Sequence, residues 1–475
     1  MATDDITLVT ATDQLAALNR REISAVELLQ AHLVRQDEIH DQVNAIVTLD
    51  IDRAMDTARS IDDDRATGRA LGPMAGLPMT VKDALATAGI RSTGGAAELL
   101  DHVPDADAEV VAATRTAGAV IWGKSNLPRW SGDIQARNPM FGATNNPWDL
   151  RRGPGGSSGG AAAAVATGIT PLDIGTDIGG SIRLPAHFSG VCGHKPSYGT
   201  VSQRGYIDRW PVARVEADIN GVGPLARHPD DLELLLEVIR RPDSTLDATR
   251  GAARDLRVAA WLDDPACPLN ADVASVLNEA VAEIEASGVT IDRAARPSHR
   301  FDDVFSIGLP LLMATLSPGR TDDEFDDLMA KRDDPDPTMR MRASGSTMSH
   351  REWFRLAEER EARRNSWADF FTQHDVLLAP VAFTTAFEHV DSGNLYTRRL
   401  PGDDGDRPYA DLLSWTVQFG YVHLPVTVVP AGWTPAGLPV GIQIVGPYLG
   451  DRTTLEFARL VHEVTGGWRV PPIVA

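Results

Sequence analysis

The chain has 475 residues, enough for two or three average domains or for one large α/β domain. Apolar residues make up 43% of it, which suffices for a large buried core. The formal net charge of −21 argues against nucleic acid or an anionic membrane surface as a partner, because phosphate binding needs clustered cations.

The cysteines and the first residues set two further limits. Cys192 and Cys267 cannot build a disulfide framework, and neither has a CxxC or His neighbour at metal-ligand spacing, so they predict no metal site. The chain starts with acidic residues and lacks an apolar signal core, and no apolar run approaches the ~18 residues of a membrane span. We therefore expect a cytoplasmic protein.

Helix-like and strand-like segments alternate along the chain. Residues 10–49 have a helical pattern with an S-x-x-E capping box at Ser24 and Glu27. Further helices are expected at 107–117, 161–166, 273–284 and 454–464, and strands at 76–81, 119–122, 171–176, 256–262, 424–429 and 438–445. Polar or Pro- and Gly-rich stretches predict linkers or loops at 241–256, 318–349 and 391–409. Because no clean break in composition separates these segments, we predict one α/β domain over residues 1–475.

Two glycine-flanked serines lie between residues 151 and 199. One is in RRGPGGSSGGAAAA (Arg151 to Ala164), and the other is in GTDIGGSIRLPA (Gly175 to Ala186). Glycine lets the backbone adopt positive φ and lets a ligand approach the main chain closely. A Gly-Gly-Ser turn can also direct consecutive N–H groups at one point, as an oxyanion hole requires.

Three other interpretations fit the same loops. The first loop could cradle a phosphate, but it lacks the Gly-Lys-Ser/Thr ending of a P-loop. Either loop could be a structural turn, which is the more frequent role of an isolated GGS. A Ser-His-Asp triad is a third interpretation; neither serine lies in a G-x-S-x-G elbow, although His187 and His194 lie near the second loop.

Together with a lysine at the end of an upstream strand, the two loops closely resemble the amidase signature family. That family has a GGSSGG loop, the serine of GTDxGGSIR 24 residues later, and a lysine in a V-K-D context upstream. Here Ser157 and Ser181 are 24 positions apart, and Lys82 lies 75 positions before Ser157. The resemblance extends to NPMFGATNNPW (Asn138 to Trp148), GHKPSYG (Gly193 to Gly199), GVGPLARHPDDL (Gly221 to Leu232) and GLPVGIQIVGP (Gly437 to Pro447).

The resemblance implies a fold and a division of the chain. The fold is α/β, a single large domain with a mixed β-sheet covered by helices on both faces, without metal or cofactor. The signature core lies at about residues 70–235, and a divergent part that shapes the substrate pocket lies at about 300–420.

The resemblance also implies catalytic roles. Ser181 is the nucleophile, Ser157 bridges it to Lys82, and Lys82 is the base. A serine hydroxyl is a poor nucleophile at neutral pH, and a neutral lysine can activate it if burial lowers the pKa of the amine. In the family, the bridging serine sits before a cis peptide bond. Two other lysines compete for the base role, but Lys124, in an expected loop, and Lys195, before a proline, are expected to be structural.

Supporting roles are implied for the backbone and for two side chains. The N–H groups expected to form the oxyanion hole are those of Ile178, Gly179, Gly180 and Ser181. Ser158 and Asp177 are expected to hold the loop geometry, and a purely structural role is as good an interpretation for both.

The implied activity is hydrolysis of an amide-type C–N bond in a small-molecule amide or carbamate, through a serine acyl-enzyme. The pocket is expected from the divergent part and from residues 129–137, where Trp130, Ser131, Gly132 and Asp133 are the predicted substrate-binding residues. Further pocket candidates are Trp210, Met313, Met341, Trp353, Trp415, Phe419 and Tyr421. These side chains favour an apolar or aromatic substrate such as an anilide, an aryl or fatty amide, or a urethane, which some bacterial members of the family hydrolyse.

We expect a monomer or a homodimer. Two other functions stay open from the sequence. One is the glutaminase subunit of a tRNA-dependent amidotransferase, which needs a companion subunit. The other is a catalytically silent binding protein on the same scaffold.

Overall fold

The fold was analysed in a computed structural model that describes residues 5–207 and 214–474. Its helices are α1 (Ala11–Asn19), α2 (Ala25–Val43), α3 (Ile51–Thr67), α4 (Glu109–Thr116), α5 (Gly159–Ala166), α6 (Arg183–Ser189), α7 (Pro229–Ile239), α8 (Ala271–Ala286), α9 (Leu309–Thr315), α10 (Asp322–Met329), α11 (Pro337–Ser346), α12 (His350–Gln373), α13 (Ser414–Gly420) and α14 (Asp451–Val464). Its strands are β1 (Ile46–Leu49), β2 (Pro78–Lys82), β3 (Val120–Ser125), β4 (Arg137–Asn138), β5 (Gly142–Ala143), β6 (Leu172–Asp177), β7 (Cys192–Lys195), β8 (Gly221–Ala226), β9 (Val258–Ala260), β10 (Ile291–Asp292), β11 (Val376–Pro380), β12 (Arg399–Leu400), β13 (Arg407–Pro408), β14 (Val426–Trp433) and β15 (Pro439–Val445).

One mixed sheet of 11 strands runs through the described part of the chain, in the order β1-β3-β2-β6-β8-β7-β14-β15-β11-β9-β10. The neighbours β3, β2 and β6 are parallel, whereas each neighbouring pair from β6 through β8, β7 and β14 to β15 is antiparallel. Because parallel strands end at the same edge of a sheet, the last residues of β2 and β6, Lys82 and Asp177, are brought to one edge.

The sheet separates two buried cores. In β11, Val376 and Leu378 join one core while Leu377 and Ala379 join the other, as the alternation of a strand requires. The first core includes side chains of α7, α8 and α14, and the second includes side chains of α6, α9, α12 and α13. The predicted single α/β domain, with a mixed sheet covered by helices on both faces, is confirmed.

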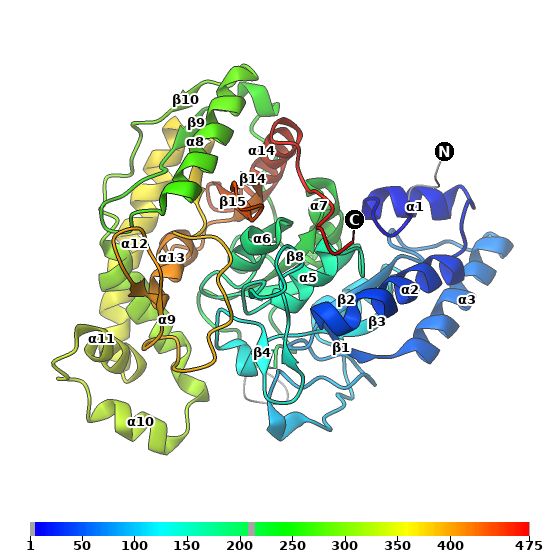
Figure 1. The fold of residues 1–475 in the computed structure, drawn as a ribbon, viewed down its shortest axis with the longest axis horizontal. Coiled ribbons are helices and arrows are strands. Elements are labelled where there is room, and N and C mark those ends of the chain that lie inside the picture. The colour runs from blue at the N-terminus through cyan, green and yellow to red at the C-terminus, as the bar shows by residue number, and fades with distance from the viewer. Residues whose placement is uncertain (1–4, 208–213, 475) are drawn as a thin grey trace.

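Figure 1 shows where the helices lie around this sheet. Helices α1, α2 and α3 lie at one end of the molecule, and α9 to α12 lie at the other, beside α13. The sheet edge with β2 and β3 lies nearer the first end. None of the helices in the described residues is long and apolar enough to cross a membrane.

Several expected segments differ from the structure. The helical stretch 10–49 is two helices followed by strand β1, because Asn44 ends α2 in a left-handed conformation. The loop expected at 318–349 contains α10 and α11, each begun by a side-chain cap, at Thr321 and Asp336. Lys124 lies inside β3 and not in a loop.

Candidate active site

Lys82, the predicted base, is fully buried at the end of β2. Its amine donates hydrogen bonds to Ser157 Oγ at 2.6 Å, to Ser158 Oγ at 2.9 Å and to Thr176 Oγ1 at 2.8 Å. Burial lowers the pKa of Lys82 to about 7, and the negative charges of Asp177 and Asp173 oppose that shift. The amine can therefore be neutral near neutral pH.

Ser157 and Ser158 are carried by the glycine-rich loop that leads into α5. Both side chains are fully buried, and the Gly156–Ser157 peptide bond is cis. The sequence expectation put a cis bond after Ser157, so its position is corrected by one residue. Gly156 is required by packing: a Cβ there would lie 2.6 Å from the carbonyl carbon of Ile134 and 2.7 Å from the Gln135 nitrogen.

Ser181, the predicted nucleophile, follows the turn at the end of β6 and is partly exposed. The Ser158 N–H donates to the Ser181 carbonyl oxygen at 3.1 Å, which ties the two serine loops together. The Ser181 hydroxyl makes no hydrogen bond to any residue within 5–207 and 214–474. The predicted contact between Ser181 and Ser157 is therefore not formed in this structure. Of the three predicted catalytic side chains, Ser181 is the one that solvent can reach.

Asp177 fixes the turn that carries Ser181. Its carboxylate accepts the Gly180 N–H at 2.8 Å, the Ile182 N–H at 3.1 Å and two guanidinium N–H groups of Arg183 at 2.8 and 2.9 Å. Burial alone raises the pKa of Asp177, but the Arg183 guanidinium outweighs it and holds that pKa at about 2. The expected support role of Asp177 thus has a physical basis: a permanent negative charge that organises the turn.

The oxyanion hole has fewer free N–H donors in the structure than the sequence predicts. The Gly180 N–H is committed to Asp177, so Gly180 shapes the turn instead of supplying a free donor. The N–H groups of Ile178, Gly179 and Ser181 donate to no other described residue. Gly180 has a φ of 128°, and a Cβ there would lie 2.7 Å from Thr416 Oγ1, so only glycine fits.

The predicted substrate loop, residues 129–137, packs directly on the serine loop at Gly156. Trp130 and Ser131 have positive φ, and Trp130 is partly buried beside Gly94. Gly132 is exposed. The Asp133 carboxylate is fully used: it accepts from Ile134 N at 2.7 Å, from the Tyr409 hydroxyl at 3.0 Å and from Arg398 Nη1 at 2.5 Å. Asp133 therefore braces this loop against the divergent part.

Comparison with known proteins settles the family. A family model described as Amidase matches residues 27–455. A glutamyl-tRNA(Gln) amidotransferase subunit of Moorella thermoacetica is 32% identical over 499 residues, covering 96% of each chain. The corresponding subunit of a Synechococcus species is 33% identical over 483 residues, covering 93% of each chain. The chain belongs to the amidase family.

Solved structures agree with that assignment. A structure described as an amidase superposes with a TM-score of 0.80 at 27% identity, over 96% of this chain and 99% of that one. A bacterial aryl acylamidase of the amidase signature family superposes with a TM-score of 0.80 at 22% identity, over 96% of each chain, which supports the fold alone. This amidase is accordingly a hydrolase of the amidase signature family.

The aromatic and methionine candidates for the amidase pocket have separate places. Met313, Trp415, Phe419 and Tyr421 are buried in the second core, and Met341 and Trp353 are partly buried against it. Trp210 lies outside the described residues. Sequence reasoning missed Leu312 of α9 and Leu413: a Cβ on Gly179 would lie 3.4 Å and 3.5 Å from their Cδ2 atoms. Neither leucine lies in a sequence motif, so no pattern in the sequence indicates this contact.

The rival bases of this amidase have other partners. His187 contacts the backbone of Gly441 and Thr384, and burial lowers its pKa to about 4. His194 contacts Thr427 at 2.9 Å and Asp451 at 3.1 Å. Neither histidine contacts a predicted catalytic residue.

The rival lysines are likewise engaged elsewhere. Lys124 donates to the Leu85 carbonyl at 2.5 Å and to Thr87 Oγ1 at 2.6 Å. Lys195 donates to the carbonyl oxygens of Pro196 at 3.3 Å and Leu424 at 3.2 Å. Both amines thus hold backbone in place.

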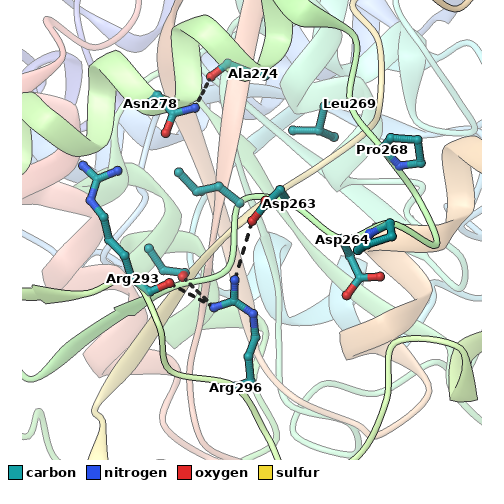
Figure 2. A pocket seen from close by; sticks show the side chains of 11 residues that line it. Asp263, Asp264, Pro268, Leu269, Ala274, Asn278, Arg293 and Arg296 are labelled. Carbon is teal, nitrogen blue, oxygen red and sulfur yellow. Dashed lines mark hydrogen bonds and ion pairs between the residues drawn. The ribbon is translucent and has the colours of Figure 1, made fainter. Parts of the chain in front are cut away.

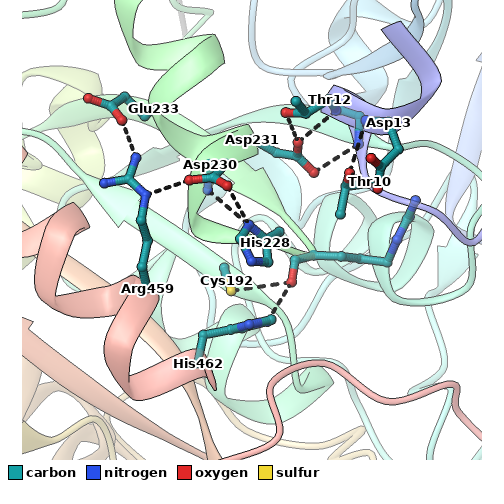
Figure 3. A network of polar contacts seen from close by, with 12 residues as sticks. Thr10, Thr12, Asp13, Cys192, His228, Asp230, Asp231, Glu233, Arg459 and His462 are labelled. Atoms are coloured by element: carbon teal, nitrogen blue, oxygen red, sulfur yellow. Dashed lines mark hydrogen bonds and ion pairs between the residues drawn. The ribbon is translucent and has the colours of Figure 1, made fainter. Parts of the chain in front are cut away.

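Two other polar features lie apart from the serine loops. Figure 2 shows a cavity of about 620 Å³ beside β9 and α8, where Asp263 and Arg296 face each other at 3.6 Å. Figure 3 shows a network in which Arg459 of α14 pairs with Asp230 and Glu233 of α7, and Asp231 accepts N–H groups at the start of α1. Within the described ranges no cluster of His, Cys, Asp or Glu could hold a metal ion.

The packing at Gly156 predicts that an added Cβ lowers stability and kcat at this position but not at Gly153. Gly156→Ala places a Cβ against backbone atoms that cannot rotate away, so we expect a loss of about 1–3 kcal/mol in the free energy of unfolding and a lower kcat. Gly153→Ala is the matched control in the same loop, because its Cβ would come no closer than 3.8 Å to the surrounding atoms. Denaturant unfolding and kcat of both variants check this. Equal stability of the two variants would contradict it.

Proposed function

We propose that this amidase hydrolyses an amide-type C–N bond of a small molecule through an acyl-enzyme on Ser181, with Ser157 as relay and Lys82 as base. One observation carries the proposal. The amine of buried Lys82, whose pKa burial lowers to about 7, lies 2.6 Å from Ser157 Oγ. The N–H of the next residue, Ser158, donates a hydrogen bond to the carbonyl oxygen of the partly exposed Ser181.

The proposed first half-reaction forms the acyl-enzyme. Rotation of the Ser181 hydroxyl toward Ser157 completes the relay, so the Ser181 proton passes to Ser157 while the Ser157 proton passes to Lys82. Ser181 Oγ bonds to the substrate carbonyl carbon, and the resulting oxyanion accepts hydrogen bonds from the free N–H groups of the turn. The C–N bond then breaks, and the relay returns the proton to the departing amine.

The second half-reaction releases the acid. Water gives one proton to the relay and adds to the acyl carbon, and the bond from that carbon to Ser181 Oγ breaks. Ser181 regains its proton from Lys82 through Ser157. Every proton taken up by Lys82 is returned, so the relay is regenerated at the end of each turnover.

The substrate proposal follows from the side chains above the turn. Leu312 and Leu413 are buried apolar side chains that pack beside Gly179, and we propose that they border the space for the acyl part of a bound substrate. An uncharged acyl group, aliphatic or aromatic, fits such a surface because no charge is left unpaired. Anilides, aryl or fatty amides and carbamates carry the same reacting group and are the proposed class.

The glutaminase alternative is favoured by one observation. The relatives that match over nearly their whole length are named as amidotransferase subunits, at 32% and 33% identity. Glutamine carries two charges that need charged or polar partners, and the two leucines over Gly179 offer none. We therefore propose the small-molecule amidase first, acting as a monomer or a homodimer. Co-purification of the chain with a second, different protein tests the alternative.

A labelling experiment and a substrate screen test the proposal together. A fluorophosphonate probe is expected to modify Ser181, located within the labelled peptide by fragment-ion mass spectrometry, because Ser157 and Ser158 are fully buried. Amine release is then measured with anilides, alkyl amides, carbamates, esters and free glutamine. Labelling at Ser157, or ammonia release from glutamine alone, would overturn the corresponding part.

A further inference from the structure

Asp173 is a buried carboxyl that the proposed mechanism leaves unused. It lies in β6, is fully buried, and its Oδ2 accepts a hydrogen bond from the Thr80 hydroxyl at 2.6 Å. Its Oδ1 is buried and accepts no hydrogen bond of good geometry among residues 5–207 and 214–474, although the Ser125 hydroxyl also acts on this carboxyl. A buried carboxyl without a cationic hydrogen-bond partner is costly, so a function for it is worth seeking.

The register of the sheet places Asp173 on the same face as Lys82. Thr80 in β2 is paired with Asp173 in β6, and the next pair is Val81 with Ile174. Thr80 and Lys82 are two residues apart, so their side chains point to one face. Val81 and Ile174 belong to the first core on the opposite face. The Asp173 side chain therefore lies on the face of the sheet that carries Lys82, beside Thr80 and two residues before Lys82 along β2.

The charges around Lys82 differ in their partners. Asp177 is neutralised by Arg183, whose guanidinium donates two hydrogen bonds to it. Asp173 has no such cation in contact. Burial raises the pKa of Asp173 to about 7, and the hydroxyls of Thr80 and Ser125 and the charges of Lys124 and Lys82 oppose that rise. Asp173 and Lys82 can thus both change protonation in the same pH range.

We propose that Asp173 is a positioning residue of the reaction, whose carboxylate stabilises the ammonium form that Lys82 adopts when it holds the proton taken from Ser157. The inference rests on the proposed function, in which Lys82 is the base. Burial disfavours that ammonium, and a carboxylate on the same face offsets the penalty without blocking the return of the proton to Ser157.

Other charged groups pack around this pair. Asp83, next to Lys82, accepts hydrogen bonds from Thr93, and α5, which packs against β6, consists of glycine, alanine and valine. The charged groups from the remaining elements are Lys124 of β3, Asp177 of β6, Arg183 of α6 and Lys195 of β7. Of the three carboxyls Asp83, Asp173 and Asp177, Asp173 is the one that both shares the face of Lys82 and lacks a cationic hydrogen-bond partner.

The test compares the pH dependence of kcat/KM in the wild type, Asp173→Asn and Asp231→Asn. Asparagine keeps the shape and can still accept the Thr80 hydrogen bond, but it carries no charge. We expect the rising limb of the Asp173→Asn profile, in which kcat/KM increases as Lys82 loses its proton, to move to lower pH by about one unit, because the ammonium loses its stabilising charge. Asp231 of α7, a buried carboxyl that accepts N–H groups at the start of α1 (Figure 3), is the control: its loss is expected to lower Tm and leave the limb in place.

The outcomes separate a positioning role from a structural one. A lower plateau with an unmoved limb in Asp173→Asn would overturn the inference. If that variant fails to fold, Thr80→Val removes the hydrogen bond that favours the ionised carboxyl, and a smaller shift in the same direction is expected; no shift would overturn the inference too. A rising limb of the kcat/KM profile that persists in Lys82→Ala would instead contradict the proposed function.

Discussion

Replacing Ser181 with alanine is expected to lower kcat by about 10⁴-fold or more while leaving Tm near the wild-type value. The hydroxyl makes no hydrogen bond to a described residue, so its removal leaves no buried partner unpaired. The substitution removes the group that forms the bond to carbon, and no other serine of the two loops is exposed. Steady-state kinetics on a substrate from the screen and a thermal melt measure both effects.

The same kinetics test whether the three residues act as one unit. Ser157→Ala and Lys82→Ala are each expected to lose several orders of magnitude, and the double variant is expected to lose little more than either single one. Ser189→Ala is the control, a buried serine of α6 that donates only to the Pro154 carbonyl at 3.3 Å. Additive losses in the double variant would show that Ser157 and Lys82 work separately.

The parts predicted from sequence are those where residues close in the chain determine the geometry. The glycines around Ser157 and Ser181 had to be in tight loops, and Lys82 had to end a strand that is buried throughout. The resemblance supplied the pairing of these segments, and parallel pairing of β2 with β6 is what brings Lys82 to Thr176 and the serine loops.

The parts that sequence reasoning missed depend on contacts between distant segments. Asp133 reads as a free carboxylate in an exposed loop, yet Arg398 and Tyr409 occupy it from 265 and 276 residues away. Gly180 reads as an oxyanion donor, but its N–H is directed at a side chain three residues back. Leu312 and Leu413 lie in a region with no motif, so only packing against Gly179 reveals them.

The kcat/KM of the wild type is expected to rise with pH through about 7 and to level off in the alkaline range. Lys82 can accept a proton only as the neutral amine, and burial lowers its pKa from the ordinary range to about 7. The neutral fraction is therefore about one half near pH 7, falls below that pH and approaches one above it. Substrates with aniline-type leaving groups should react faster than alkyl ones if proton delivery to nitrogen limits the rate.

Two variants give this profile a clear interpretation. Lys82→Ala removes the base, and Lys82→Arg keeps a positive charge and hydrogen-bond donors but stays protonated throughout the range. Both are expected to lose the limb along with several orders of magnitude in kcat/KM, measured from pH 5 to 10 with one anilide and one carbamate. A limb near pH 8 that persists in Lys82→Ala would assign the base to Lys124 or Lys195, whose pKa values burial lowers to about 8. Activity that stays flat from pH 5 to 10 in Lys82→Ala would point to His187, whose pKa burial lowers to about 4. The position of the limb and its loss with Lys82 together therefore identify the base.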